Sequence, residues 1–344
     1  MTKMYLFFIK GLFIFIAIVS VIGCGGEAAK SSETVAKEQF QEKDQLTILN
    51  ERIAADTTNA QLYYDRCRLL ISNNDIVDAA DDILRALELE PENAKYYETA
   101  SVLLLQVNDS RAAINMLQRG LDIKPLDVPL RLQLGRLYLI VRQYEQANEQ
   151  FDRIIAFAPT EAAAYHFKAL VLKEQGKDGE MTPLLEKAIQ YDPEFTDAYM
   201  QLGMLYSKKK DPLAIQYFDN ALRVEPKRID ALYAKGYFYQ RQEDFSNAKK
   251  AYRAIMKIDP QYEFAIYNVG YLLMLEDSLA ASEKHFNMAV KVAPSYADAY
   301  QMRGFAAELQ GKKEQALRDY EQALIFEEGH PKATEGIKRL KAEK

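Results

Sequence analysis

The side chains best suited to chemistry are few, and their spacing does not assemble a catalytic or metal site. His166, His285 and His330 form neither an HxxxH nor an HExxH pair, the spacings at which one helix presents two zinc ligands. Cys67 stands at a small-residue position of an apolar pattern, which favours a buried thiol over a nucleophile. None of these residues therefore indicates an enzyme.

Charge and glycine spacing exclude two further classes of protein. The chain carries 44 basic and 50 acidic residues, a net charge of −6, whereas a nucleic-acid-binding protein needs a basic stripe. Gly311, Lys312 and Lys313 have the wrong spacing for a phosphate-binding loop, and no Ser or Thr follows them. We therefore predict a protein without catalytic residues, metal or cofactor, which does not bind nucleic acid.

A proline recurs through the chain at an almost constant interval. Successive members of the series are 34, 34, 34, 33, 34 and 34 residues apart, and each follows an apolar helical pattern. Because proline cannot continue a helix, this period predicts the end of a helix and a turn in each repeat. The series consists of Pro91, Pro125, Pro159, Pro193, Pro226, Pro260 and Pro294.

Small and large residues recur in register with these prolines. Twelve residues before the proline the residue is small, as at Ala79 and Ala248, and eight residues before it the residue is large and apolar, as at Phe151. Further back lies a glycine, as at Gly135 and Gly203. This pattern resembles the tetratricopeptide repeat over residues 60–328. Small residues let two helices approach closely, and large ones fill the space between neighbouring repeats.

The resemblance implies an all-α fold. We expect an α-solenoid, a right-handed superhelix of about eight helix-turn-helix repeats over residues 60–328. A single repeat cannot bury its apolar face, so both ends of the stack need covering. Residues 40–59 are expected to form a half repeat that caps the N-terminal end, and residues 329–344 a helix that caps the C-terminal end.

In the proteins that this chain resembles, the first helix of each repeat lines a concave groove. In the C-terminal half of the chain, aromatic side chains and methionine fall on the exposed positions of these helices, and they suit recognition of a peptide or helix. The same side chains could instead pack against one another and make the groove rigid. The predicted groove residues are Met200, Met204, Tyr233, Tyr237, Phe264, Tyr267, Tyr271, Met274 and Phe305.

The first 23 residues have the features of a secretory signal. Lys3 and Lys10 accompany a short apolar core that ends in small residues. Residues 21–24, Val-Ile-Gly-Cys, resemble a bacterial lipobox, which implies cleavage before Cys24 and lipidation of its thiol. Residues 24–39 are then a flexible tether. The alternative is an uncleaved anchor over residues 4–22, in which the charge of Lys10 would be costly.

These features predict a non-catalytic scaffold or adaptor of the bacterial cell envelope, held to the membrane by its N-terminal lipid. Gly25 rather than Asp follows the cysteine, so we expect the outer membrane, at its periplasmic face or at the cell surface. The expected partner is a peptide or helical segment of another envelope protein. One alternative is a substrate-handling lipoprotein that binds glycan or peptidoglycan, with tyrosines stacking on sugars, although the chain has no Trp. A structural role through self-association is the other.

Overall fold

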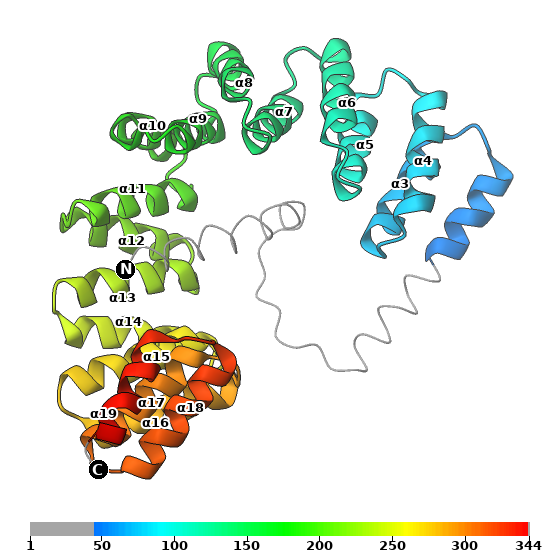
Figure 1. Ribbon diagram of the computed structural model, residues 1–344. Coiled ribbons are helices and arrows are strands. Elements are labelled where there is room, and N and C mark those ends of the chain that lie inside the picture. The colour runs from blue at the N-terminus through cyan, green and yellow to red at the C-terminus, as the bar shows by residue number, and fades with distance from the viewer. Residues whose placement is uncertain (1–44, 343–344) are drawn as a thin grey trace. The chain divides into compact units, whose positions relative to one another are not determined.

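A computed structural model describes residues 45–342, which form helices and turns without a strand. The chain divides into two compact units, residues 1–123 and residues 124–344. In the first unit, helix 45–55 precedes four helices (Figure 1). These are α3 (Ala60–Ser72), α4 (Ile76–Leu89), α5 (Ala94–Gln106) and α6 (Ser110–Ile123).

The second unit continues the same succession of helices, coloured from green to red in Figure 1. Its elements are α7 (Val128–Ile140), α8 (Tyr144–Phe157), α9 (Ala162–Glu174), the short 3₁₀ helix η1 (Asp178–Glu180), α10 (Thr182–Tyr191), α11 (Thr196–Lys208), α12 (Leu213–Val224), α13 (Ile229–Arg241), α14 (Phe245–Ile258), α15 (Glu263–Leu275), α16 (Leu279–Val292), α17 (Ala297–Leu309), α18 (Lys313–Phe326) and α19 (Pro331–Ala342).

The helices from α3 to α18 form eight pairs. The odd-numbered helix is the first and the even-numbered helix the second of each pair, and the two pack against each other. Within the second unit, each second helix also packs on the first helix of the next pair, as α14 does on α15 and α16 on α17. The predicted all-α solenoid of eight helix-turn-helix repeats is confirmed, and the periodic prolines lie in the turns between pairs.

The turn inside each pair contains one residue in the left-handed region of backbone conformation. In the fourth repeat this residue is Gly176, with φ +74°, and glycine adopts that conformation without strain. In the sixth repeat it is Glu243, with φ 61°. A side chain at such a position costs free energy, so the turn geometry here is imposed by the packing of the helices that it joins.

In each helix pair, a small residue of the first helix packs against a large residue of the second helix. A Cβ atom added to Gly135 would lie 2.5 Å from Phe151, and one added to Gly236 would lie 2.8 Å from Tyr252. In the three repeats whose first helix has a larger residue at this position, the register partner is aliphatic instead of aromatic. Those pairs are Cys67 with Ile83, Ser101 with Leu117, and Ala169 with Leu185, all of them buried. The two volumes therefore vary together, which keeps the helices of a pair close.

Candidate interaction face

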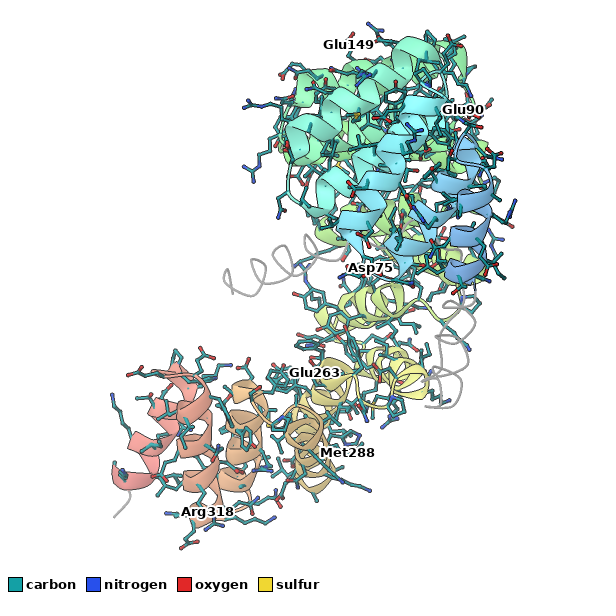
Figure 2. All side chains as sticks on the ribbon, turned by 90° about the vertical axis from the view of Figure 1, so that its right-hand side faces the viewer. Asp75, Glu90, Glu149, Glu263, Met288 and Arg318 are labelled. Carbon is teal, nitrogen blue, oxygen red and sulfur yellow. The ribbon has the colours of Figure 1, made fainter. Side chains whose placement is uncertain are left out.

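The first helices of the second unit lie next to one another. Helix α7 contacts α9, α11 contacts α13, and α17 contacts both α15 and α19. We call the surface formed by α7, α9, α11, α13, α15 and α17 the first-helix face. Figure 2 labels Glu263, the first residue of α15, and also Met288 and Arg318, which belong to the second helices α16 and α18.

Consecutive repeats contact one another on this face. We call the set of contacts between two consecutive repeats a seam. In three of these seams, the residue two positions after the turn proline packs on the residue seven positions after the preceding turn proline. Tyr262 lies 6.3 Å from Tyr233 between ring centroids, and Tyr296 lies 5.2 Å from Tyr267. The ring of Tyr296 also meets Phe264 edge-on at 5.6 Å. Edge-to-face and tilted pairs of this kind each contribute about 0.5–1.5 kcal/mol beyond simple burial.

Two seams have polar contacts instead of aromatic ones. Arg228 stands at the same position as Tyr262 and donates to Asp197 of the preceding repeat at 2.6 Å. His330 stands there before α19, with Nε2 at 3.2 Å from Asp298. Its Nδ1 accepts from the backbone N–H of Ala333 at 3.3 Å, which places the proton on Nε2 in the neutral ring. The residue two positions after the turn proline thus makes either ring contacts or polar contacts with the preceding repeat.

The structure distributes the nine predicted groove residues over a range of burial. Three are exposed: Met204 (41%), Tyr237 (37%) and Phe264 (41%). Met200 is buried and packs in a core cluster with Tyr199 and Phe218. The other five are half-buried and pack partly on core residues, namely Tyr233, Tyr267, Tyr271, Met274 and Phe305.

Two tyrosines of the seams, Tyr262 and Tyr296, were not among the predicted residues. Each lies 29 residues after the tyrosine that it contacts, in the turn that leads into the next repeat. The recurrence of an aromatic residue two positions after Pro193, Pro260 and Pro294 is the sequence signal that would have revealed them. They connect the predicted side chains into one aromatic surface.

The tyrosines of this surface are held as neutral phenols. Burial raises the pKa of Tyr262 to about 12, and burial also raises the pKa of Tyr233, Tyr267 and Tyr296. The hydroxyl of Tyr233 accepts a hydrogen bond from Nδ2 of Asn268 at 3.1 Å. The exposed rings of Tyr237 and Phe264 lie beside these buried tyrosines and extend the aromatic surface to solvent.

Towards its N-terminal end the first-helix face carries cations. Arg136 of α7 lies over the ring of Phe167 at 5.2 Å, and Nζ of Lys173 donates to Oε1 of Gln201 at 3.4 Å. Burial lowers the pKa of both cations. Between them in sequence lies His166, which is 5% exposed and packs at 5.1 Å from Phe195.

Among residues 45–342, no group of three or more His, Cys, Asp or Glu side chains is arranged to hold a metal ion. Cys67 is buried, and burial raises the pKa of its thiol to about 12, which makes it a poor nucleophile. In the first unit, residues of helix 45–55, α3 and α4 line an open pocket of about 250 Å³, to which Asp78, Asp81 and Asp82 contribute. Arg66 holds Asp82 through two hydrogen bonds of 2.6 and 2.8 Å, so this carboxylate is already engaged.

The predicted signal, the lipobox cysteine Cys24 and the tether lie outside the described residues. Within the part of the chain that the structure describes, no helix is both long enough and apolar enough to span a membrane.

Comparison with known proteins links this architecture to one family. The family model for the second ARM domain of tetratricopeptide repeat protein 21 matches residues 48–303, and a tetratricopeptide repeat model matches residues 297–324. The C-terminal part of a TPR repeat-containing protein from Cytophaga hutchinsonii has a similar crystal structure, with a TM-score of 0.58 at 17% identity. The match covers 69% of this chain and 98% of that one. That likeness shows the fold.

Two human proteins are similar in sequence. Protein O-mannosyl-transferase TMTC3 is 25% identical over 228 residues, which are 64% of this chain and 24% of that protein. Tetratricopeptide repeat protein 13 is 26% identical over 125 residues, 36% of this chain and 14% of that protein. The chain therefore spans about a quarter or less of the length of these relatives.

Proposed function

Because this chain belongs to the tetratricopeptide repeat family, we propose that it is a non-catalytic scaffold whose first-helix face binds a segment of another protein. Repeats of this family generally act as protein-interaction scaffolds. The observation that carries the proposal is the exposure of Tyr237, Phe264 and Met204 beside a packed aromatic surface. Exposed aromatic rings on a rigid support lose little conformational entropy when a partner covers them.

The aromatic seams support this proposal because they hold neighbouring repeats together and leave some aromatic side chains of the face exposed. Tyr233, Tyr267 and Tyr296 make ring contacts between repeats, whereas Tyr237 is more than a third exposed, with the guanidinium of Arg241 over its ring at 5.9 Å. A bound peptide or helix would pack its apolar side chains against such rings. The glycan-binding alternative has less support. A tyrosine ring must be exposed to stack on a sugar, and most tyrosine rings of this face pack against neighbouring side chains.

The test places a photo-reactive phenylalanine analogue at Tyr237 and, as a matched control, at Met288. Both side chains are exposed, but Met288 lies on a second helix. In the cells that produce the protein, light should join position 237 to one defined segment of one partner, identified by mass spectrometry. Equal adducts at both positions, or adducts at 288 alone, would contradict the proposal.

We further propose that Cys24 is lipidated and that the chain is anchored in a bacterial envelope, at the outer membrane. The support is the lipobox-like Val-Ile-Gly-Cys after a short apolar run. A labelled fatty acid should enter the wild-type protein and the Cys67→Ser variant, and Cys24→Ser should lose the label. Because the chain has only these two cysteines, label retained in Cys24→Ser would refute thiol lipidation. Fractionation of the labelled cells would then place the protein in the outer or the inner membrane.

A further inference from the structure

Arg136 and Lys173 differ from the other half-buried cations of the second unit. Most of those are ion-paired: Lys168 with Asp152, Lys235 with Asp219, and Lys249 with Glu276. Glu174 and Asp178 act on Lys173 electrostatically, and Asp178 pairs with Lys208, but among residues 45–342 neither Arg136 nor Lys173 forms an ion pair. Their closest contacts are an aromatic ring and an amide oxygen, neither of which neutralises a charge.

The ring of His166 adds a second, independent sign of a missing partner. It is 5% exposed, and neither Nδ1 nor Nε2 has a hydrogen-bond partner within the described part of the chain. The charged groups that act on it are Asp197, Lys173, Arg136 and Arg228. Asp197 already pairs with Arg228, so the remaining charges around the ring are positive.

Unpaired and partly desolvated cations cost free energy, as do buried ring nitrogens without a partner. In a chain of net charge −6, Arg136, Lys173 and His166 gather on one face, and within the described residues none of the three forms an ion pair. An incoming carboxylate would satisfy them, because a charge-assisted hydrogen bond to arginine or lysine is stronger than one between neutral groups. Phe167 and Phe195 beside the histidine would keep that contact away from water, which strengthens it.

We propose that Arg136 and Lys173, next to His166, bind carboxylate side chains of the segment that occupies the first-helix face. The inference rests on the proposed function and adds the chemistry of the partner: its segment is acidic where it meets α7 and α9 and apolar where it meets α13 and α15. The two ends of the face therefore recognise different parts of one polypeptide and fix the direction in which it lies.

The probe is a fluorescein-labelled hexaglutamate peptide with an amidated C-terminus, added to the full chain and followed by fluorescence polarisation. Hexaserine and hexalysine peptides serve as probes without negative charge. We expect hexaglutamate alone to bind, more weakly at higher salt, and the variant Arg136→Gln with Lys173→Gln to bind at least about tenfold more weakly. The control variant, Arg253→Gln with Lys257→Gln, removes two exposed cations of the second helix α14 and should bind like the wild type.

A second measurement follows the His166 ring by NMR while the peptide is bound. A carboxylate next to the ring favours the imidazolium, so the pKa of His166 should rise on binding in the wild type but not in the Arg136→Gln, Lys173→Gln variant. Equal binding of hexaglutamate by the two double variants, or no binding by the wild type, would overturn the carboxylate site. Neither result bears on the adduct at position 237, so the proposed function fails or survives separately.

Discussion

The fourth and the sixth repeats pack their two helices together with different pairs of side chains. In the fourth, Ala169 of α9 stands in register with Leu185 of α10, whereas in the sixth Gly236 of α13 faces Tyr252 of α14. The turn residue with positive φ is Gly176 in one repeat and Glu243 in the other.

The first-helix face differs between the two repeats as well. The same position carries His166 in the fourth repeat, covered by Phe195, and Tyr233 in the sixth, covered by Tyr262. The face residue lies three positions before the small residue of the core pair, and in the sixth repeat Tyr233 also packs on Tyr252, at 5.5 Å between ring centroids. The comparison teaches that the spacing of helices is preserved by matched volumes while the chemistry of the face changes from one repeat to the next.

The largest expected difference between the two repeats is in acid stability. Burial lowers the pKa of His166 from 6.5 to about 4, and Asp197 opposes this shift only in part. Between these pH values the unfolded chain binds a proton that the folded chain does not. The contribution of His166 is therefore fully present above pH 6.5 and falls as the pH drops towards 4, by up to roughly 3 kcal/mol.

Replacing His166 by Phe, which makes this position aromatic and uncharged as in the sixth repeat, should flatten that part of the pH dependence. Urea unfolding of both proteins across the range gives the free energy of unfolding at each pH. The difference between the two proteins must grow in acid; parallel curves would show that His166 is protonated equally in the folded and unfolded chains.

The core pair should show the next largest effect. Gly236→Ala puts a methyl group where a Cβ would lie 2.8 Å from Tyr252, and overpacking, less the helix preference of alanine, should cost about 2 kcal/mol. Ala169→Gly in the fourth repeat should cost about 1 kcal/mol through lost propensity and a small void. Chemical denaturation measures both.

The volume rule itself is tested by a double-mutant cycle. In the background Tyr252→Leu, which has an aliphatic partner as in the fourth repeat, Gly236→Ala should lose most of its cost. If it costs the same with either partner, the volumes of the pair are not coupled.

The seams come third. Tyr262→Leu removes ring contacts with Tyr233 and Phe264, and we expect a loss of about 1–2 kcal/mol. Phe195→Leu removes one ring contact, that with His166, and should cost less. Thermal unfolding of the two variants ranks them, and a larger loss for Phe195→Leu would reverse the expected order.

The smallest effect is at the turn and has the opposite sign. Glu243→Gly relieves the positive φ, and after the added freedom of the unfolded chain it should stabilise the protein by about half a kcal/mol. Gly176→Ala in the fourth repeat should destabilise it by about 1 kcal/mol for the same reason. If both substitutions changed the free energy of unfolding in the same direction, backbone strain at the positive φ would not determine the stability of these turns.

The helix pairs could be predicted because the residues that determine each pair lie within one repeat of the sequence. Within one repeat, a proline, a glycine such as Gly135 and a large residue such as Phe151 recur at fixed distances, and each has a direct backbone or packing reason. The seams could not be predicted in the same way, since Tyr262 and Tyr233 belong to different repeats and meet only after stacking. Nor does the sequence reveal that, within the described residues, both ring nitrogens of His166 lack a hydrogen-bond partner, because this depends on the folded surroundings.

Because every seam is shared by two repeats, a repeat is not a self-contained part for exchange or duplication. Moving the sixth repeat elsewhere would carry Tyr233 away from Tyr262 and bring Arg228 beside a residue other than Asp197. Such a transplant would create two mismatched joints even if the helix pair itself remained well packed. Recombination that preserves this surface must therefore cut inside a repeat, between its two helices, so that each inherited piece keeps a complete seam.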